Sequence, residues 1–119
     1  MKIGPLLSAI VMSMLFVSNN SLSKEFNFTG NDLYQGCKAA VTRQMPTETL
    51  KIHAGICLGI VNTVIVLHGG ELICPPANVS TDQTIMMLVK YMEDNPDKLN
   101  YPLSFLAEDF FTNTWTCKN

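Results

Sequence analysis

The sequence predicts an all-α fold: a small disulfide-bonded bundle of about four helices, arranged as two αα-hairpins, after a cleavable signal peptide. Three observations predict it. Apolar residues recur at i, i+3, i+4 and i+7 behind residues that favour helix N-caps. Proline and glycine separate these segments. The 119 residues suffice for one domain at most, and they include four cysteines, an even number.

The first segment has the layout of a secretory signal peptide. A positive start precedes a mostly apolar run over residues 3–17, and Ser21 and Ser23 supply the small residues of a cleavage site. A membrane anchor is the alternative, but it needs about 18 continuous apolar residues. We therefore expect a signal peptide over residues 1–23 and a mature exported domain over residues 24–119, without a stable membrane anchor.

The first helix is expected over residues 30–42. Thr29 is a good N-cap, and Asp32 would stand in the first turn, where a negative charge is favourable. Leu33 and Cys37 then share one side of the helix. Pro46 ends the pattern.

A second helix is expected over residues 48–68, with Thr47 as its N-cap and Gly69-Gly70 as its stop. Residues 54–67 are nearly all apolar, so this should be the buried central helix. The apolar stretch is too short to cross a bilayer. Its β-branched content would also suit a strand, and the caps and the length favour the helix.

Two more helices follow an extended Cys-Pro-Pro segment. Ser80 and Gln83 form a capping box, and apolar residues at helical spacing follow it as far as Met92. The methionines of this helix fit core or packing positions. Pro96 stops the third helix, and Pro102 opens a fourth that ends near residue 114.

The four cysteines predict two disulfides, because an even number in a short exported chain is typical of a disulfide framework. The two hairpins would bring Cys37 beside Cys57 and Cys74 beside Cys117, which favours this pairing among the three possible ones. No C-x-x-C pair is present, so a metal or redox site is disfavoured, although His53 and Cys57 could share a helix face. We expect no cofactor.

Five short motifs together resemble the Rap/Tai-type immunity proteins of type VI secretion. They are Phe28-Thr29-Gly30-Asn31-Asp32-Leu33-Tyr34 with Cys37, Cys57-Leu58-Gly59-Ile60, Cys74-Pro75-Pro76 with Val79-Ser80, Val89-Lys90-Tyr91-Met92 with Asn95-Pro96, and a final Cys117. The resemblance implies a periplasmic, all-α, disulfide-bonded protein, often a homodimer. It also implies that the protein binds and blocks a peptidoglycan amidase toxin, with one loop in the toxin's catalytic groove.

Two connecting segments are the candidates for that loop. One contains His68, Gly69, Gly70 and Glu71, and it should be flexible before the rigid Cys-Pro-Pro anchor. The other is acidic and contains Glu93, Asp94, Asp97 and Lys98. Carboxylates there could meet a basic rim and steer association. The alternative is that both are ordinary helix connectors.

Other functional classes have less support. Eight basic against ten acidic side chains exclude a basic nucleic-acid footprint. Neither His53 nor His68 has a convincing catalytic setting, and the adjacent Glu108 and Asp109 would point in different directions on a helix. We therefore expect no enzymatic activity. An exported helical chaperone or apolar-ligand carrier, or a housekeeping member of the family without a toxin, remain as alternatives.

Overall fold

A computed structural model describes residues 27–118. Its α-helices are α2 (Gly30–Thr42), α3 (Glu48–His68), α4 (Thr81–Asp94) and α5 (Leu103–Thr114), with a 3-10 turn η1 (Pro96–Lys98) between the last two. Each predicted helix is confirmed at its predicted position. Within residues 27–118 there is no β-strand, only isolated bridges such as Thr29 with Pro102. The expected signal peptide, residues 1–23, lies outside the described residues.

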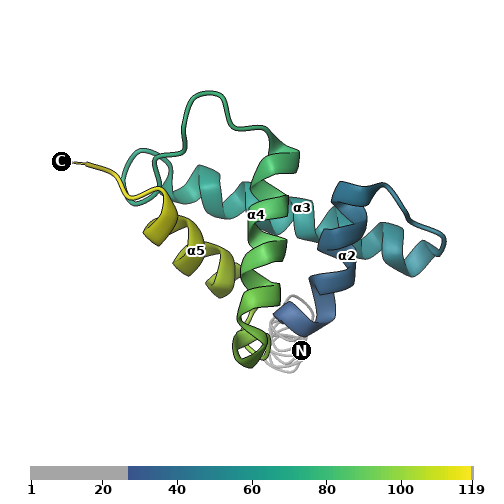
Figure 1. The fold of residues 1–119 in the computed structure, drawn as a ribbon. Coiled ribbons are helices and arrows are strands. Elements are labelled where there is room, and N and C mark those ends of the chain that lie inside the picture. Colours follow the sequence, from purple (N-terminus) through teal and green to yellow (C-terminus); the bar gives the residue numbers. More distant parts are fainter. Residues whose placement is uncertain (1–26, 119) are drawn as a thin grey trace, which may run out of the picture.

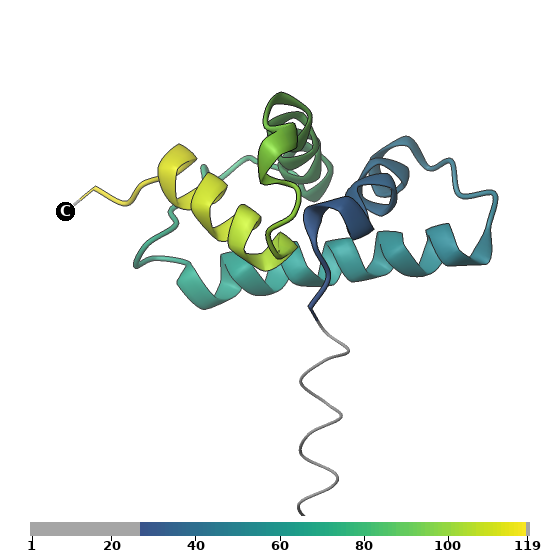
Figure 2. The same cartoon turned by 90° about the horizontal axis from the view of Figure 1, so that it is seen from below.

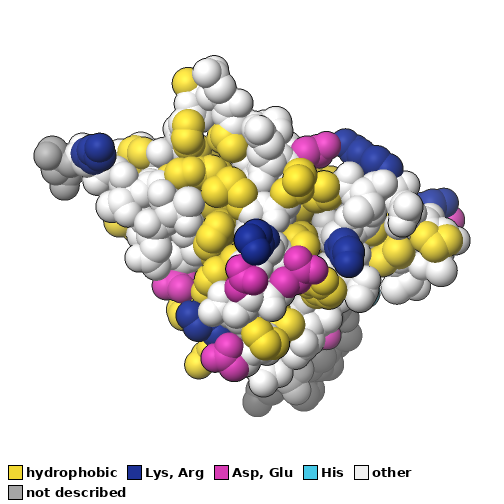
Figure 3. Space-filling model, viewed as in Figure 1, with side chains coloured by type: hydrophobic (Ala, Val, Ile, Leu, Met, Phe, Trp, Pro, Cys, Tyr) yellow, Lys and Arg dark blue, Asp and Glu magenta, His cyan; other side chains and the backbone are white. Residues whose placement is uncertain are grey.

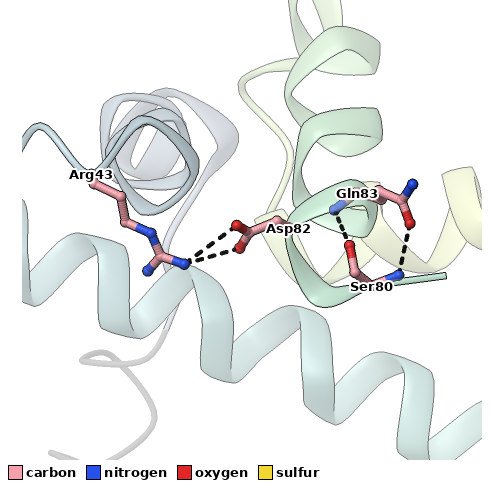
Figure 4. Close-up of polar contacts among 4 residues, drawn as sticks. All are labelled: Arg43, Ser80, Asp82 and Gln83. Atoms are coloured by element: carbon pink, nitrogen blue, oxygen red, sulfur yellow. Dashed lines mark hydrogen bonds and ion pairs between the residues drawn. The ribbon is translucent and has the colours of Figure 1, made fainter.

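The caps explain where the helices begin. Thr29 and Ser80 each form a capping box, with Asp32 and Gln83 as the respective partners. Figure 4 shows the reciprocal bonds between Ser80 and Gln83. The hydrogen bond from the Thr29 backbone, followed by that from its side chain, lowers the pKa of Asp32. Thr47 caps α3 by accepting from the backbone of Leu50, at 3.1 Å.

The helices form two layers. Figure 2 shows α3 alone along one side of the molecule, with α2, α4 and α5 all on its other side. The hairpin of α2 and α3 is closely packed, whereas α4 packs mainly against α2, and α5 packs mainly against α3. The second hairpin is therefore open. Its helices, α4 and α5, contact the helices of the first hairpin more than they contact each other.

The core lies between these layers. Its fully buried side chains come from all four helices and from the α3–α4 connector: Leu33, Cys37, Cys57, Val61, Ile73, Ile85, Leu88, Met92, Leu103, Leu106 and Phe111. Among the methionines expected in core or packing positions, Met92 is buried, Met87 is half-buried, and Met86 is 54% exposed. Burial of the apolar face of each helix is the main stabilising term for such a bundle.

The expectation that α3 is the buried central helix is wrong. Only one of its faces reaches the core, while Ile52, Val66 and Leu67 on other faces are 59%, 79% and 69% exposed. The physical reason is the layer arrangement, because every neighbouring helix lies on the same side of α3. The whole helix, at 21 residues, is also longer than the stretch judged too short for a bilayer. By length and composition it could cross a membrane, with 22% of its most apolar window buried.

The disulfides are Cys37–Cys57 and Cys74–Cys117, as the hairpin layout predicts. The first joins α2 to α3 with 5.4 Å between the Cα atoms. The second joins the α3–α4 connector to the C-terminal segment, with a Cα–Cα distance of 5.0 Å. Because Cys57 is in a disulfide, it cannot pair with His53 as a metal ligand.

Gly36 sets the distance between α2 and α3. A Cβ atom at this position would lie 2.6 Å from the backbone carbon of His53, which is closer than any real contact. At Gly55 of α3, by contrast, a Cβ atom would meet nothing within 4 Å. The first glycine is therefore required by packing, and the second is not required by the fold of the single chain.

This contrast yields a prediction about stability. Gly36→Ala should lower the free energy of unfolding by about 1–3 kcal/mol, because the helices must separate. Gly55→Ala should raise it by up to about 1 kcal/mol in the monomeric chain, because alanine is the better helix former. Denaturant titration at low protein concentration measures both. Equal effects of the two substitutions would contradict the close approach of α2 and α3.

Candidate functional site

The α3–α4 connector begins with a closed turn that contains three of the predicted binding residues. His68, the last residue of α3, accepts backbone hydrogen bonds from Glu71, Leu72 and Ile73 at 2.9–3.2 Å. Gly70 has a positive φ of 83°, which other residues rarely adopt. The segment that was expected to be flexible is therefore a hydrogen-bonded turn, with Glu71 and Leu72 exposed at its surface.

Several contacts hold this connector in place. Ile73 is completely buried, and the Cys74 N–H donates to the carbonyl of Trp115 at 2.7 Å. The Cys74–Cys117 disulfide adds a covalent tie, and Pro75 and Pro76 restrict the backbone that follows. Residues 76–78 are largely exposed and arch away from the body of the molecule (Figure 1). The connector therefore projects from the surface on a fixed base.

The second predicted segment, which includes the end of α4 and the α4–α5 connector, makes more side-chain contacts within the chain than the turn at His68 does. Glu93 accepts a hydrogen bond from the Tyr34 hydroxyl at 2.6 Å, and Asp94 lies 3.4 Å from Lys90. The Lys98 ammonium is 3.5 Å from the Tyr91 hydroxyl. Glu93 thus joins α4 to α2, and Lys98 joins η1 to α4.

Two pKa values are displaced at this connector. The hydrogen bond to Glu93, burial and the Glu93 charge raise the pKa of Tyr34, in that order of size. The pKa of Lys98 is also raised, chiefly by its hydrogen bond and charge interaction with Tyr91. Asp97, in η1, is exposed. Of the acidic residues predicted in this segment, Asp97 is therefore the one best placed to meet a partner.

The structure does not bring the two predicted segments together. The turn at His68 lies at the C-terminal end of α3, whereas Asp97 lies beyond the C-terminal end of α4 (Figures 1 and 2). A helix between them carries two acidic residues that the sequence analysis assigned to no site. Glu108 lies 3.8 Å from the His68 ring nitrogen, and Asp109 accepts from Tyr91 at 3.3 Å. Adjacent residues on a helix point in different directions, which is why Glu108 and Asp109 contact different partners.

An apolar cleft of about 460 Å³ lies beside the projecting connector. Its lining includes Pro76 and Val79 of the connector, Met86 and Met87 of α4, and Trp115. Figure 3 shows hydrophobic side chains gathered at the surface near the beginning of α4. The exposure of Met86, which the helical periodicity did not predict, is explained by its position in this lining.

Two kinds of reactive group can be checked among the described side chains. All four cysteines are in disulfides, so the chain presents no thiol nucleophile. Within residues 27–118, no three His, Cys, Asp or Glu side chains are grouped to hold a metal ion. Figure 4 shows Arg43 paired with Asp82 between α2 and α4, at 3.3 Å, an exposed contact with a structural role.

Comparison with known families decides the identity. The model of the Rap1a immunity proteins matches residues 29–117, from the cap of α2 to the last cysteine. The chain belongs to the Rap1a immunity protein family. The resemblance seen in the sequence motifs is thereby confirmed, and immunity proteins act by binding a toxin protein. No curated protein and no solved structure gave a significant match.

The contact between Tyr34 and Glu93 can be tested through pH. Because the pKa of Tyr34 is raised, its contribution to stability is complete below about pH 10 and is lost as pH rises through the raised value. Tyr34→Phe should therefore cost under about 1 kcal/mol at neutral pH and reduce the loss of stability at alkaline pH. Denaturant titrations from about pH 8 to pH 11 measure this, with Tyr101→Phe as the control. An unchanged alkaline loss in Tyr34→Phe would contradict the assignment.

Proposed function

We propose that this Rap1a family protein is a periplasmic immunity protein that binds and blocks a peptidoglycan amidase toxin of type VI secretion. It would thereby protect the cell that produces it. The family match over residues 29–117 carries the proposal, because it includes all four helices and both disulfides. The same resemblance predicts a homodimer.

Two features support a periplasmic site of action. Both cysteine pairs form disulfides, and such bonds persist in oxidising compartments such as the bacterial periplasm. The sequence of residues 1–23 has the layout of a signal peptide. An amidase that cuts peptidoglycan acts in that same compartment, so inhibitor and toxin would meet where the substrate is.

The α3–α4 connector is the best candidate for the loop that enters the toxin's groove. It is exposed, and it is fixed at its base by buried Ile73, the Cys74–Cys117 disulfide and two prolines. A loop that is already ordered loses little conformational entropy on binding, which favours tight association. Leu72, 48% exposed at the turn, offers an apolar contact beside the carboxylate of Glu71.

The acidic α4–α5 connector would have a different role. Asp97 is exposed there, and Asp94 pairs only across the surface with Lys90. Negative charges at such positions increase the association rate with a basic surface, and salt screens them. We therefore assign steering to this connector, while the α3–α4 connector supplies the contacts that hold the toxin.

A carrier of apolar ligands is the alternative function, and the cleft near Met86 and Trp115 is the observation that favours it. Its volume of about 460 Å³ is within the range of ligand sites. A carrier should bind a hydrophobic dye in this cleft, and toxin should not be needed for that binding. An immunity protein need not bind the dye.

The decisive experiment for the proposed function is a titration of inhibition. Oxidised protein, residues 24–119, is added to the amidase toxin from the same locus while peptidoglycan hydrolysis is followed. We expect hydrolysis to fall to zero at a fixed molar ratio. Full hydrolysis at a large excess of the protein, together with no binding, would exclude that toxin and favour the carrier alternative.

The two connectors should respond differently to charge reversal. Glu71→Lys should weaken toxin affinity at least about tenfold, mainly through faster dissociation. Asp97→Lys should slow association several-fold at low salt and have little effect at high salt. The double variant Thr42→Lys/Gln44→Lys makes the same change in charge at the end of α2 and in the α2–α3 connector, and it serves as the control. Surface plasmon resonance measures both rates, and identical effects of all three variants would contradict these separate roles.

A further inference from the structure

We propose that the Cys74–Cys117 disulfide is a site of reversible reduction by a dithiol, and that its opening loosens the α3–α4 connector while the rest of the fold stays intact. The different exposure of the two disulfides carries this inference. The effect on toxin binding rests on the proposed function, whereas the reduction itself does not.

The two disulfides lie in different surroundings. Cys37 and Cys57 are both 0% exposed and belong to the hydrophobic core. Cys74 is exposed and Cys117 is half-buried, at the edge of the molecule where the C-terminal segment leaves α5 (Figure 1). Thiol–disulfide exchange requires the attacking sulfur to reach the disulfide. A dithiol can therefore reach the second disulfide in the folded protein, but it reaches the first only when the core opens.

The exchange balances with a dithiol as its only co-reactant. One thiolate of the dithiol attacks Sγ of Cys74, the S–S bond breaks, and Cys117 leaves as a thiolate that takes up a proton. The second thiolate of the dithiol then attacks the mixed disulfide and releases Cys74, which also takes up a proton. The protein gains two electrons and two protons, and the dithiol becomes a disulfide. Lys118, the residue after Cys117, supplies a positive charge that stabilises the leaving thiolate.

Non-covalent contacts keep the two cysteines close together after the bond opens. The Cys74 N–H donates to the carbonyl of Trp115 at 2.7 Å, and Ile73 forms a bridge with Thr116. The Trp115 ring stacks on buried Phe111, with 5.0 Å between the ring centroids. The C-terminal segment therefore stays beside the connector, and the disulfide can form again when the dithiol is removed.

The arch of the connector, residues 75–79, depends on the disulfide more strongly. Within the part of the chain that the structure describes, the arch makes one backbone–backbone hydrogen bond, from the Val79 N–H to the carbonyl of Pro76 at 3.3 Å. Cys74 precedes the arch directly, so its covalent tie is the anchor from which the arch projects. A disulfide restricts the conformations of the chain that it closes. Its opening therefore lets the arch sample more positions.

A more mobile arch changes how strongly a toxin is held. A loop that must be ordered on binding loses conformational entropy, and this loss lowers the affinity. The reduced protein is therefore the weaker inhibitor, although its core disulfide still joins α2 to α3. Full inhibition requires the Cys74–Cys117 bond, which persists in an oxidising compartment.

The first test measures which disulfide is reduced, without any toxin. Oxidised protein, produced from the full chain by export, is treated with limiting dithiothreitol, and iodoacetamide then labels the free thiols. Mass spectrometry should find Cys74 and Cys117 labelled at least about tenfold faster than Cys37 and Cys57. Circular dichroism should show unchanged helix content, and removal of the reductant should restore the bond. Equal labelling rates, or faster labelling of the core pair, would overturn the proposal.

The second test measures the loosening of the connector. Trp115 is the single tryptophan of the chain, and it lines the cleft with Pro76 and Val79, so its fluorescence should shift on reduction. The backbone N–H of residue 74 should exchange with solvent at least about tenfold faster in the reduced protein and in Cys74→Ser/Cys117→Ser. The N–H of Val61 in α3 is the internal control and should exchange at the same rate in all forms. Unchanged exchange at residue 74 in the reduced protein would overturn the loosening.

The third test measures the effect on toxin binding. Cys74→Ser/Cys117→Ser should bind the toxin at least about fivefold more weakly than the unmodified oxidised protein. Dithiothreitol at the same limiting dose should not change the affinity of this variant, because its remaining disulfide is buried. Equal affinity of the two proteins would overturn the effect on binding. No binding by the unmodified protein would contradict the proposed function instead, and the labelling and exchange results would still decide the reduction site.

Discussion

The close contact of α2 with α3 is the constraint on which the rest of the structure depends. Gly36 brings the two helices together at His53, and the neighbouring Cys37 forms a disulfide with Cys57. A side chain at Gly36 would separate the helices and strain that disulfide. The remaining helices then pack on this pair, α4 mainly on α2 and α5 mainly on α3. The crossing therefore determines the position of every connector.

This arrangement also determines which parts of the chain lie at the surface. Since α2, α4 and α5 all lie on one side of α3, the described helices leave its other side uncovered, and Ile52, Val66 and Leu67 are exposed. The second disulfide fixes the α3–α4 connector near the end of α5, well away from the α2–α3 connector.

Much of the fold could be predicted because its signals are local. Capping residues such as Thr29 and Ser80 act within one turn, and the prolines act on the adjacent backbone. The disulfide pairing also followed, since hairpin geometry limits which cysteines can meet. The orientation of α3 did not follow, because a helix that is apolar on nearly every side gives no periodic signal for the face that is buried.

The candidate site was harder to predict because its contacts join residues distant in sequence. Glu93 was selected as a partner-binding carboxylate, yet it is bonded to Tyr34, which is 59 positions away. Glu108 was assigned to no site from the sequence, and it lies 3.8 Å from His68. The cleft at Met86 likewise depends on Trp115, which the sequence does not place near α4. Such pairings arise only once the helices are packed.

The proposed neutralisation of a toxin in the periplasm can be tested in living cells. The amidase toxin of the same locus is exported to the periplasm of a host that lacks other immunity proteins, together with either the full chain or residues 24–119 without a leader. We expect cells to survive with the full chain and to lyse with the leaderless chain. Lysis in both cases, or equal survival in both, would contradict it.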